Sequence, residues 1–240
     1  MSAHRRSLGD MQIILVPGLW LDASSWDPIL PALADAGHTP VPLTMPGVGA
    51  LADESAGIGI ADWVDAVVAH IDSADDPVVL VGHSGGGNVV WGAADARPTK
   101  VARVVFVDTA PPPDGFGISE FDVVDGVVPF PGWDHFDAPD IADLDEQTRT
   151  RTAAHTAPVP AKVPTDRIRL GDERRYAVPV TVLSGSADEA GLRTMLAEWG
   201  PWNDEFAAIS DVEVVTLDTG HWPQFSQPER LAAAIVDAVR

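Results

Sequence analysis

The segment Gly82-His83-Ser84-Gly85-Gly86 carries the residue that is best suited to covalent chemistry, Ser84. It fits the pattern Gly-x-Ser-x-Gly, and it lies between a short apolar run at residues 78–81 and a helix-like stretch at residues 86–96. A sharp strand-to-helix turn exposes the serine at the carboxyl end of a sheet, and glycines on either side let strand and helix approach closely. The pattern predicts that Ser84 is the nucleophile of a serine hydrolase.

Two other glycine-rich interpretations are weaker. A phosphate-binding loop would need a Lys-Ser or Lys-Thr pair after the glycines, and none follows here. Residues 47–52 superficially resemble a dinucleotide fingerprint, but acidic residues and further glycines follow instead of an apolar helix. The histidines lack the close spacing of a metal site, so we expect neither a metal nor a cofactor.

A serine needs a base, and the base needs an acid that orients it. His221 follows the last expected strand, at residues 212–217, and is the best candidate for the base. Asp188 follows the strand expected at residues 178–183 and gives the chain order Ser, Asp, His that is typical of this architecture. Asp108, at the end of the strand expected at residues 101–107, is the rival, and Glu189 stays open. His83 is expected to point away from the turn.

The oxyanion of an acyl-transfer reaction needs backbone donors. We expect one from Gly85, directly after the nucleophile, and one from Leu19 in the loop after the first strand. Trp20, Trp133 and Trp222 are candidates for substrate binding, and Phe116, Phe121, Phe130 and Phe136 are further apolar candidates.

The pattern around these residues alternates strand and helix, which favours a mostly parallel sheet flanked by helices. Strands are expected at residues 11–16, 38–43, 78–81, 101–107, 178–183 and 212–217. Helices are expected at residues 24–36, 60–71, 86–96, 189–199 and 228–239. Residues 111–175 are rich in Pro, Gly and Asp, which predicts an inserted cap with short helices. The expected organisation is a flexible tail at residues 1–10, a core at 11–110 and 176–240, and this cap.

The bulk composition restricts the possible partners and compartments. A formal charge of −21 disfavours nucleic acid and anionic membrane as partners, so we expect a small-molecule substrate and a monomer or homodimer. The chain has no cysteine, no apolar run long enough to span a bilayer and no apolar region after the first ten residues that resembles a secretory signal. These features favour a cytoplasmic protein.

Taken together, the chain resembles the α/β-hydrolase superfamily from about Met11 onward. It is most similar to the small-capped branch that contains bacterial esterases, plant methyl esterases and hydroxynitrile lyases. The resemblance rests on residues 15–20, the serine turn, residues 184–188 and residues 220–223. It implies a triad of Ser84, Asp188 and His221, with oxyanion donors at Leu19 and Gly85. One departure is Pro17-Gly18 in the oxyanion loop, where the family often has His-Gly.

The leading hypothesis is a hydrolase of a small or medium carboxylic ester, or of a lactone, that works through an acyl-enzyme on Ser84. A lyase or carbon–carbon bond hydrolase with the same triad is the first alternative, because one fold supports several chemistries. That chemistry predicts a charged group such as Lys162 near the triad. The second alternative is a non-catalytic protein that binds a small molecule.

Overall fold

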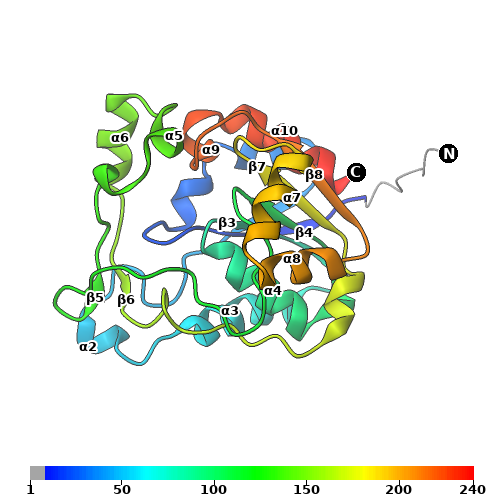
Figure 1. The fold of residues 1–240 in the computed structure, drawn as a ribbon, viewed down its shortest axis with the longest axis horizontal. Helices are drawn as coiled ribbons and strands as arrows, with labels where there is room; N and C mark the ends of the chain where they lie inside the picture. Colours follow the sequence, from blue (N-terminus) through cyan, green and yellow to red (C-terminus); the bar gives the residue numbers. More distant parts are fainter. Residues whose placement is uncertain (1–8) are drawn as a thin grey trace.

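The computed structural model describes residues 9–240, and its centre is a single parallel sheet (Figure 1). The predicted tail at residues 1–10 lies almost entirely outside the described residues. Every pair of neighbouring strands in the sheet is parallel. The spatial order is β2 (Thr39–Pro42), β1 (Gln12–Val16), β3 (Val78–His83), β4 (Val101–Val107), β7 (Val180–Ser184) and β8 (Val212–Thr216). The predicted strands and their parallel arrangement are therefore confirmed.

Alternate side chains of the strands form two separate hydrophobic cores, as the two-residue period of a strand requires. Ile14 and Leu80 belong to one core, whereas Ile13 and Val79 belong to the other. The first core also holds residues of α3 (Ile60–Ser73), α4 (Gly86–Ala96), α7 (Glu189–Glu198) and α8 (Pro201–Ala208). The second holds residues of η1 (Ala23–Trp26), α1 (Leu30–Asp35) and α10 (Pro228–Val239).

Two helical predictions need correction. The single helix expected at residues 24–36 is a short 3-10 turn, η1, followed by the separate helix α1. Pro28 and Pro31 explain the break, since a proline has no backbone N–H with which to continue the hydrogen bonds of a single helix. Helix α8 was not expected after residue 199, although Gly200-Pro201 provides a break and a new helix start.

The chain between β4 and β7, residues 108–179, is called the β4–β7 connection below. It contains η3 (Trp133–His135), α5 (Ala138–Ile141), α6 (Glu146–Ala153) and η4 (Glu173–Ala177). It also contains an antiparallel pair of short strands, β5 (Val127–Val128) and β6 (Val159–Pro160), which the sequence pattern did not predict. The short helices agree with the expected character of this segment, and the division into core and cap at residues 111 and 175 stays a prediction.

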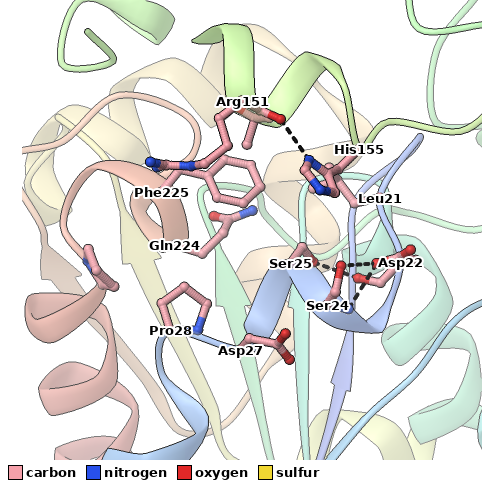
Figure 2. A pocket seen from close by; sticks show the side chains of 12 residues that line it. Leu21, Asp22, Ser24, Ser25, Asp27, Pro28, Arg151, His155, Gln224 and Phe225 are labelled. Atoms are coloured by element: carbon pink, nitrogen blue, oxygen red, sulfur yellow. Dashed lines mark hydrogen bonds between the residues drawn. The ribbon is translucent and has the colours of Figure 1, made fainter. Parts of the chain in front are cut away.

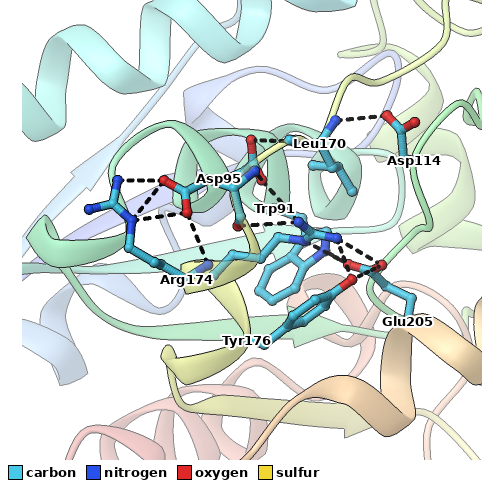
Figure 3. Close-up of polar contacts among 10 residues, drawn as sticks. Trp91, Asp95, Asp114, Leu170, Arg174, Tyr176 and Glu205 are labelled. Atoms are coloured by element: carbon cyan, nitrogen blue, oxygen red, sulfur yellow. Dashed lines mark hydrogen bonds and ion pairs between the residues drawn. The ribbon is translucent and has the colours of Figure 1, made fainter.

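A buried ion-pair network fastens the end of the β4–β7 connection to the sheet's helices (Figure 3). The Arg175 guanidinium lies 2.9 Å from a Glu205 carboxylate oxygen on α8 and 3.1 Å from Asp95 on α4. Trp91 and Tyr176 both donate hydrogen bonds to Glu205, at 2.7 and 2.9 Å. Because each buried charge has several partners, the network holds α4, α8 and η4 in one arrangement.

Two further helices are short, α2 (Ala52–Ser55) and α9 (Pro223–Ser226), and η2 (Pro98–Lys100) precedes β4. Among residues 9–240, no helix has both the length and the apolar character needed to cross a bilayer.

Candidate active site

Ser84 lies on a strained turn between β3 and α4. Its φ is +50°, a left-handed conformation that costs energy for a residue with a side chain. Its amide donates to the Val107 carbonyl at 3.1 Å, and its own carbonyl accepts from the Gly87 amide at 2.9 Å. The turn therefore joins the end of β3 to the end of β4 and to the first turn of α4. This is the geometry that the sequence pattern predicts for an exposed nucleophile.

The glycines on either side of Ser84 are required by close backbone packing. A Cβ on Gly82 would come within 2.6 Å of the Gly86 carbonyl oxygen. A Cβ on Gly86 would come within 2.6 Å of the carbonyl oxygens of both Val16 and Pro17. Because these neighbours are backbone atoms that cannot rotate away, only glycine fits at the two positions.

His221 is paired with Asp108. Its Nδ1 donates to Asp108 Oδ2 at 2.6 Å, and the other oxygen of Asp108 accepts from the Gly185 amide at 2.7 Å. Asp108 comes directly after β4, and Gly185 directly after β7, which is the neighbouring strand. The carboxylate is thus held between two strand ends. With Nδ1 donating, Nε2 of His221 is the nitrogen that is free to accept a proton.

Asp188 does not make the predicted contact with His221. Its exposed carboxylate accepts from the Gly191 amide at 2.8 Å and caps the N-terminus of α7. A carboxylate at that position satisfies an amide that has no partner within the helix, which is the usual role of an N-cap aspartate. The prediction of Asp188 as the partner of the base is therefore corrected to Asp108. The neighbouring Glu189 bonds Arg193 at 2.9 Å instead.

The protonation state of Asp108 follows from its surroundings. Burial alone would raise its pKa, but the hydrogen bonds from His221 and from the Gly185 amide outweigh burial. The net effect is a pKa below the ordinary value of 3.8, so Asp108 is ionised at neutral pH. An ionised acceptor on Nδ1 fixes the tautomer of His221 and stabilises its protonated form.

His83 supports His221 from the other side. It is almost fully buried, and its Nε2 donates to the His221 carbonyl oxygen at 2.8 Å. Its Nδ1 then accepts from the Gln224 side-chain amide at 3.2 Å. Burial, with the nearby His221 as a second cause, lowers the pKa of His83 to about 3, so this ring is neutral. The buried His83 ring thus holds the loop that carries His221, and Gln224 is a member of the site that sequence reasoning missed.

The β4–β7 connection also holds the loop that carries His221, residues 217–222, between β8 and α9. The His221 amide donates to the Asp140 carbonyl at 2.8 Å, and the Gly220 amide donates to the Asp143 carboxylate at 2.8 Å. A Cβ on Gly220 would lie 2.2 Å from the Asp140 carbonyl oxygen, so only glycine allows this approach. Neither acidic residue was predicted, because their contact with the loop spans most of the second half of the chain.

One cavity of about 190 Å³ brings the central residues together. Ser84, His221 and Asp108 line it, and so do the predicted oxyanion residues Leu19 and Gly85. In the part of the chain that the structure describes, neither the Leu19 nor the Gly85 amide donates a hydrogen bond to a protein group. The remaining wall is mainly apolar and aromatic, and it includes Trp20, Ile118, Phe121, Phe136, Trp202 and Trp222.

The three tryptophans predicted to contact substrate have different positions. Trp20 and Trp222 line the cavity and are both 5% exposed. Trp133 does not line it; its ring packs on Trp222 with centroids 5.0 Å apart, and its Nε1 donates to the Arg149 carbonyl at 2.8 Å. The prediction for Trp133 is therefore corrected, since it supports Trp222 from behind. Trp202, which belongs to the unexpected helix α8, lines the cavity instead.

Among the described residues, no group of three or more His, Asp or Glu side chains has the arrangement of a metal site.

A strained serine, an imidazole and a carboxylate at the carboxyl edge of a parallel sheet define the α/β-hydrolase class of protein. The chain belongs to the alpha/beta hydrolase family, whose sequence model matches residues 13–234.

Comparisons with individual proteins agree with this family. The chain is 36% identical over 112 residues to the putative carbamate hydrolase RutD of Variovorax paradoxus (strain S110), which covers 46% of this chain and 42% of that protein. It is 34% identical over 104 residues to a carbendazim hydrolyzing esterase of Nocardioides sp. (strain SG-4G), covering 42% and 43%. The matched segments thus span less than half of each relative.

Solved structures share the fold over nearly the whole chain. An extracellular α/β-hydrolase from a Paenibacillus species has a TM-score of 0.74 at 19% identity, covering 95% of this chain and 98% of that one. A methylesterase from Arabidopsis has a TM-score of 0.71 at 19% identity, with the same coverage. At this level of identity the likeness extends to the fold alone.

Proposed function

We propose that the protein hydrolyses small carboxylic esters through an acyl-enzyme on Ser84, with His221 as the base and Asp108 as its acid partner. The observation that carries the proposal is the hydrogen bond from His221 to Asp108 in a cavity that Ser84 also lines. The names of the curated relatives, an esterase and a carbamate hydrolase, support hydrolysis of a bond to an acyl carbon.

In the proposed reaction, Ser84 Oγ attacks the ester carbonyl while His221 Nε2 takes the hydroxyl proton. The amides of Leu19 and Gly85 receive the oxyanion, which their position on the cavity and their lack of protein acceptors support. The same proton then passes to the leaving alcohol as the tetrahedral intermediate collapses to the acyl-enzyme. Water, activated by His221, releases the acid and restores Ser84.

The cavity argues for a small acyl or alcohol group. Its volume of about 190 Å³ lies below the range of about 300–1,000 Å³ that is usual for drug-sized ligands. Its aromatic walls favour an apolar group of a few carbons over a long chain or a charged one. A lactone of similar size would fit the same description.

The lyase alternative has less support. The described residues that line the cavity include no lysine or arginine. Lys162, which that alternative would place near the triad, is more than half exposed and lies 4.0 Å from Asp166. A non-catalytic binding protein would not require the strained serine or the ionised partner of His221.

The test is turnover of p-nitrophenyl acetate, butyrate and decanoate by the wild type and by Ser84→Ala. We expect Ser84→Ala to lower turnover of the two short esters by at least about 10³-fold, because the nucleophile is removed. The decanoate should be the poorest substrate of the wild type. Ser186→Ala, an exposed serine in the loop after β7, is the matched control and should leave turnover unchanged.

Covalent capture provides an independent readout. A fluorophosphonate should label the wild type at Ser84, as located by peptide mass spectrometry, and should not label the variant. If the wild type neither cleaves the short esters nor reacts with the fluorophosphonate, the proposal is wrong. If Ser84→Ala retains turnover, another nucleophile performs the reaction.

A further inference from the structure

Asn88 is a polar side chain of the Ser84 cavity that the proposed reaction does not use. It belongs to the first turn of α4, four positions after Ser84, and it is 4% exposed. Its Nδ2 donates to the Gly117 carbonyl at 3.4 Å, which leaves Oδ1 for another donor. No donor from the described chain reaches Oδ1. A buried amide with a free acceptor, on the wall of a cavity, calls for a ligand that can donate.

The Asn88 acceptor is open to the cavity. Oδ1 is not one of the side-chain atoms in residues 9–240 that are both unbonded and sealed from solvent. Because no protein group bonds Oδ1, some of its surface is therefore accessible. The residue as a whole is almost fully buried, and the cavity of Ser84 is the space that it lines. A group that enters this cavity can therefore reach Oδ1.

Gln224 gives the contrasting case, on the larger cavity between α6, η1 and α9 (Figure 2). Its Oε1 also has no hydrogen-bond partner in the described chain, but that atom is sealed from solvent. Two carboxylates and one guanidinium line that larger cavity. Among the described residues that line the cavity of Ser84, the one carboxylate is Asp108, whose two oxygens are both bonded, and there is no lysine or arginine. The open acceptor of Asn88 therefore favours a neutral donor.

Neighbouring contacts place Asn88 on the Gly85 side of the cavity. The Asn88 backbone amide donates to the Gly85 carbonyl at 3.2 Å. A Cβ on Gly85 would lie 3.0 Å from the side chain of Ile118, which follows the Gly117 that Asn88 bonds. In the proposed reaction the Gly85 amide receives the oxyanion, whereas the leaving alcohol must reach Nε2 of His221. The part of the ester nearest to Asn88 is therefore its acyl group.

We propose that the preferred substrates are esters of short hydroxy acids, whose acyl hydroxyl donates to Asn88 Oδ1. This substrate class rests on the proposed ester hydrolysis at the same site. A hydroxyl also accepts, and the side-chain hydroxyls of Thr109 and Ser119 line the same cavity and make no hydrogen bond within residues 9–240. The rest of the wall is mainly apolar and suits the short carbon chain that carries the hydroxyl.

The test compares two pairs of ethyl esters in which a hydroxyl takes the place of a methyl group. The pairs are 3-hydroxybutyrate with 3-methylbutyrate, and 2-hydroxypropionate with 2-methylpropionate, with each hydroxy ester supplied as separate enantiomers. The kcat/KM of each ester is divided by its rate constant with hydroxide, which removes differences in intrinsic reactivity. We expect at least one hydroxy ester to exceed its methyl partner by at least about tenfold, because the methyl group leaves Asn88 Oδ1 desolvated and unbonded.

Ratios near one in both pairs would overturn this substrate class. Failure of the proposed function itself is a different result, since it appears as absent turnover of p-nitrophenyl acetate and butyrate. The ratios are measured on the wild type, so they decide the question even if a variant at Asn88 does not fold.

Asn88→Leu tests the location, since leucine has the same branching without the polar atoms. The ratio in the preferred pair should fall to about one. Asn203→Leu makes the same replacement on α8, at a position that does not line the cavity, and is the matched control that should keep the wild-type ratio. Circular dichroism verifies that both variants are folded. A folded Asn88→Leu that keeps the wild-type ratio would show that the hydroxyl binds elsewhere and would overturn the proposal.

Discussion

The loops after β4 and after β7 each carry an aspartate at the same edge of the sheet, and they use it differently. Asp108 is the first residue after its strand, with a φ of +47°, and its carboxylate bridges the Gly185 amide and His221. Asp188 comes only after Gly185, Ser186 and Ala187, and its carboxylate caps α7. An acid at the very end of a strand is held by the neighbouring strand, whereas an acid at a helix start is used by the helix.

The largest expected effect comes from neutralising Asp108. Asp108→Asn keeps the shape of the side chain but removes the charge that stabilises protonated His221 and fixes its tautomer. We expect turnover of p-nitrophenyl butyrate to fall by about 10³–10⁴-fold. Asp188→Asn should stay within about twofold of the wild type, because asparagine caps a helix as well as aspartate does. Stopped-flow or steady-state kinetics at pH 7.5 measure both variants.

This pair of variants decides between the two loops. If Asp188→Asn shows the large loss and Asp108→Asn does not, the contact seen at His221 is not the one that operates in the reaction. If both variants retain full turnover, neither Asp108 nor Asp188 is needed for the reaction, and the proposal that an aspartate assists His221 is wrong.

The same comparison shows where sequence reasoning ends. Ser84 and His221 could be predicted because each has a local pattern: a strand–turn–helix signature or a place after the last strand. The choice between Asp108 and Asp188 could not be made, since both follow Ser84 and precede His221 in the chain. The distinction depends on which strand ends are neighbours, and on the competing demand of a helix for an N-cap.

Contacts between segments that are distant in the chain could not be predicted from the sequence either. Gln224 bonds His83 across 141 positions, and the Asp143 carboxylate holds Gly220 across 77 positions. No periodicity or motif in either segment signals the other one. The alternating strands and helices of the core were predictable, because apolar runs of four to seven residues fit a sheet that is covered on both faces. The β4–β7 connection has no such period, and its short strands β5 and β6 were missed.

An intermediate effect, on the free energy of unfolding, is expected from His83, whose Nε2 donates to the His221 carbonyl oxygen. His83 is neutral in the folded chain, with a pKa of about 3 against an ordinary 6.5, so it resists protonation that the unfolded chain accepts. Stability from this group is fully present above pH 6.5 and declines as the pH falls toward 3. The slope is about 1.4 kcal/mol per pH unit while only the unfolded chain takes up the proton.

The measurement is the free energy of unfolding in urea at several pH values between 7 and 4.5, for the wild type and for His83→Gln. The wild type should lose stability more steeply than the variant by about the slope given above. Should the variant fail to fold, nitrogen chemical shifts of the wild-type imidazole answer the question directly. A His83 ring that becomes protonated near pH 6 in the folded chain would contradict the prediction.

The smallest expected effect completes the comparison at Asp188. Asp188→Ala removes the acceptor of the Gly191 amide at the start of α7, and we expect the free energy of unfolding to fall by about 0.5–2 kcal/mol. Asp188→Asn should restore most of this loss, since its side-chain oxygen can accept the same hydrogen bond. Turnover per folded molecule should be unchanged in both variants, because α7 contributes no residue to the cavity of Ser84. Urea denaturation measures the free energy of unfolding, and p-nitrophenyl butyrate kinetics on the same preparations measure turnover. A loss of turnover without a loss of stability in Asp188→Ala would show that Asp188 takes part in the reaction.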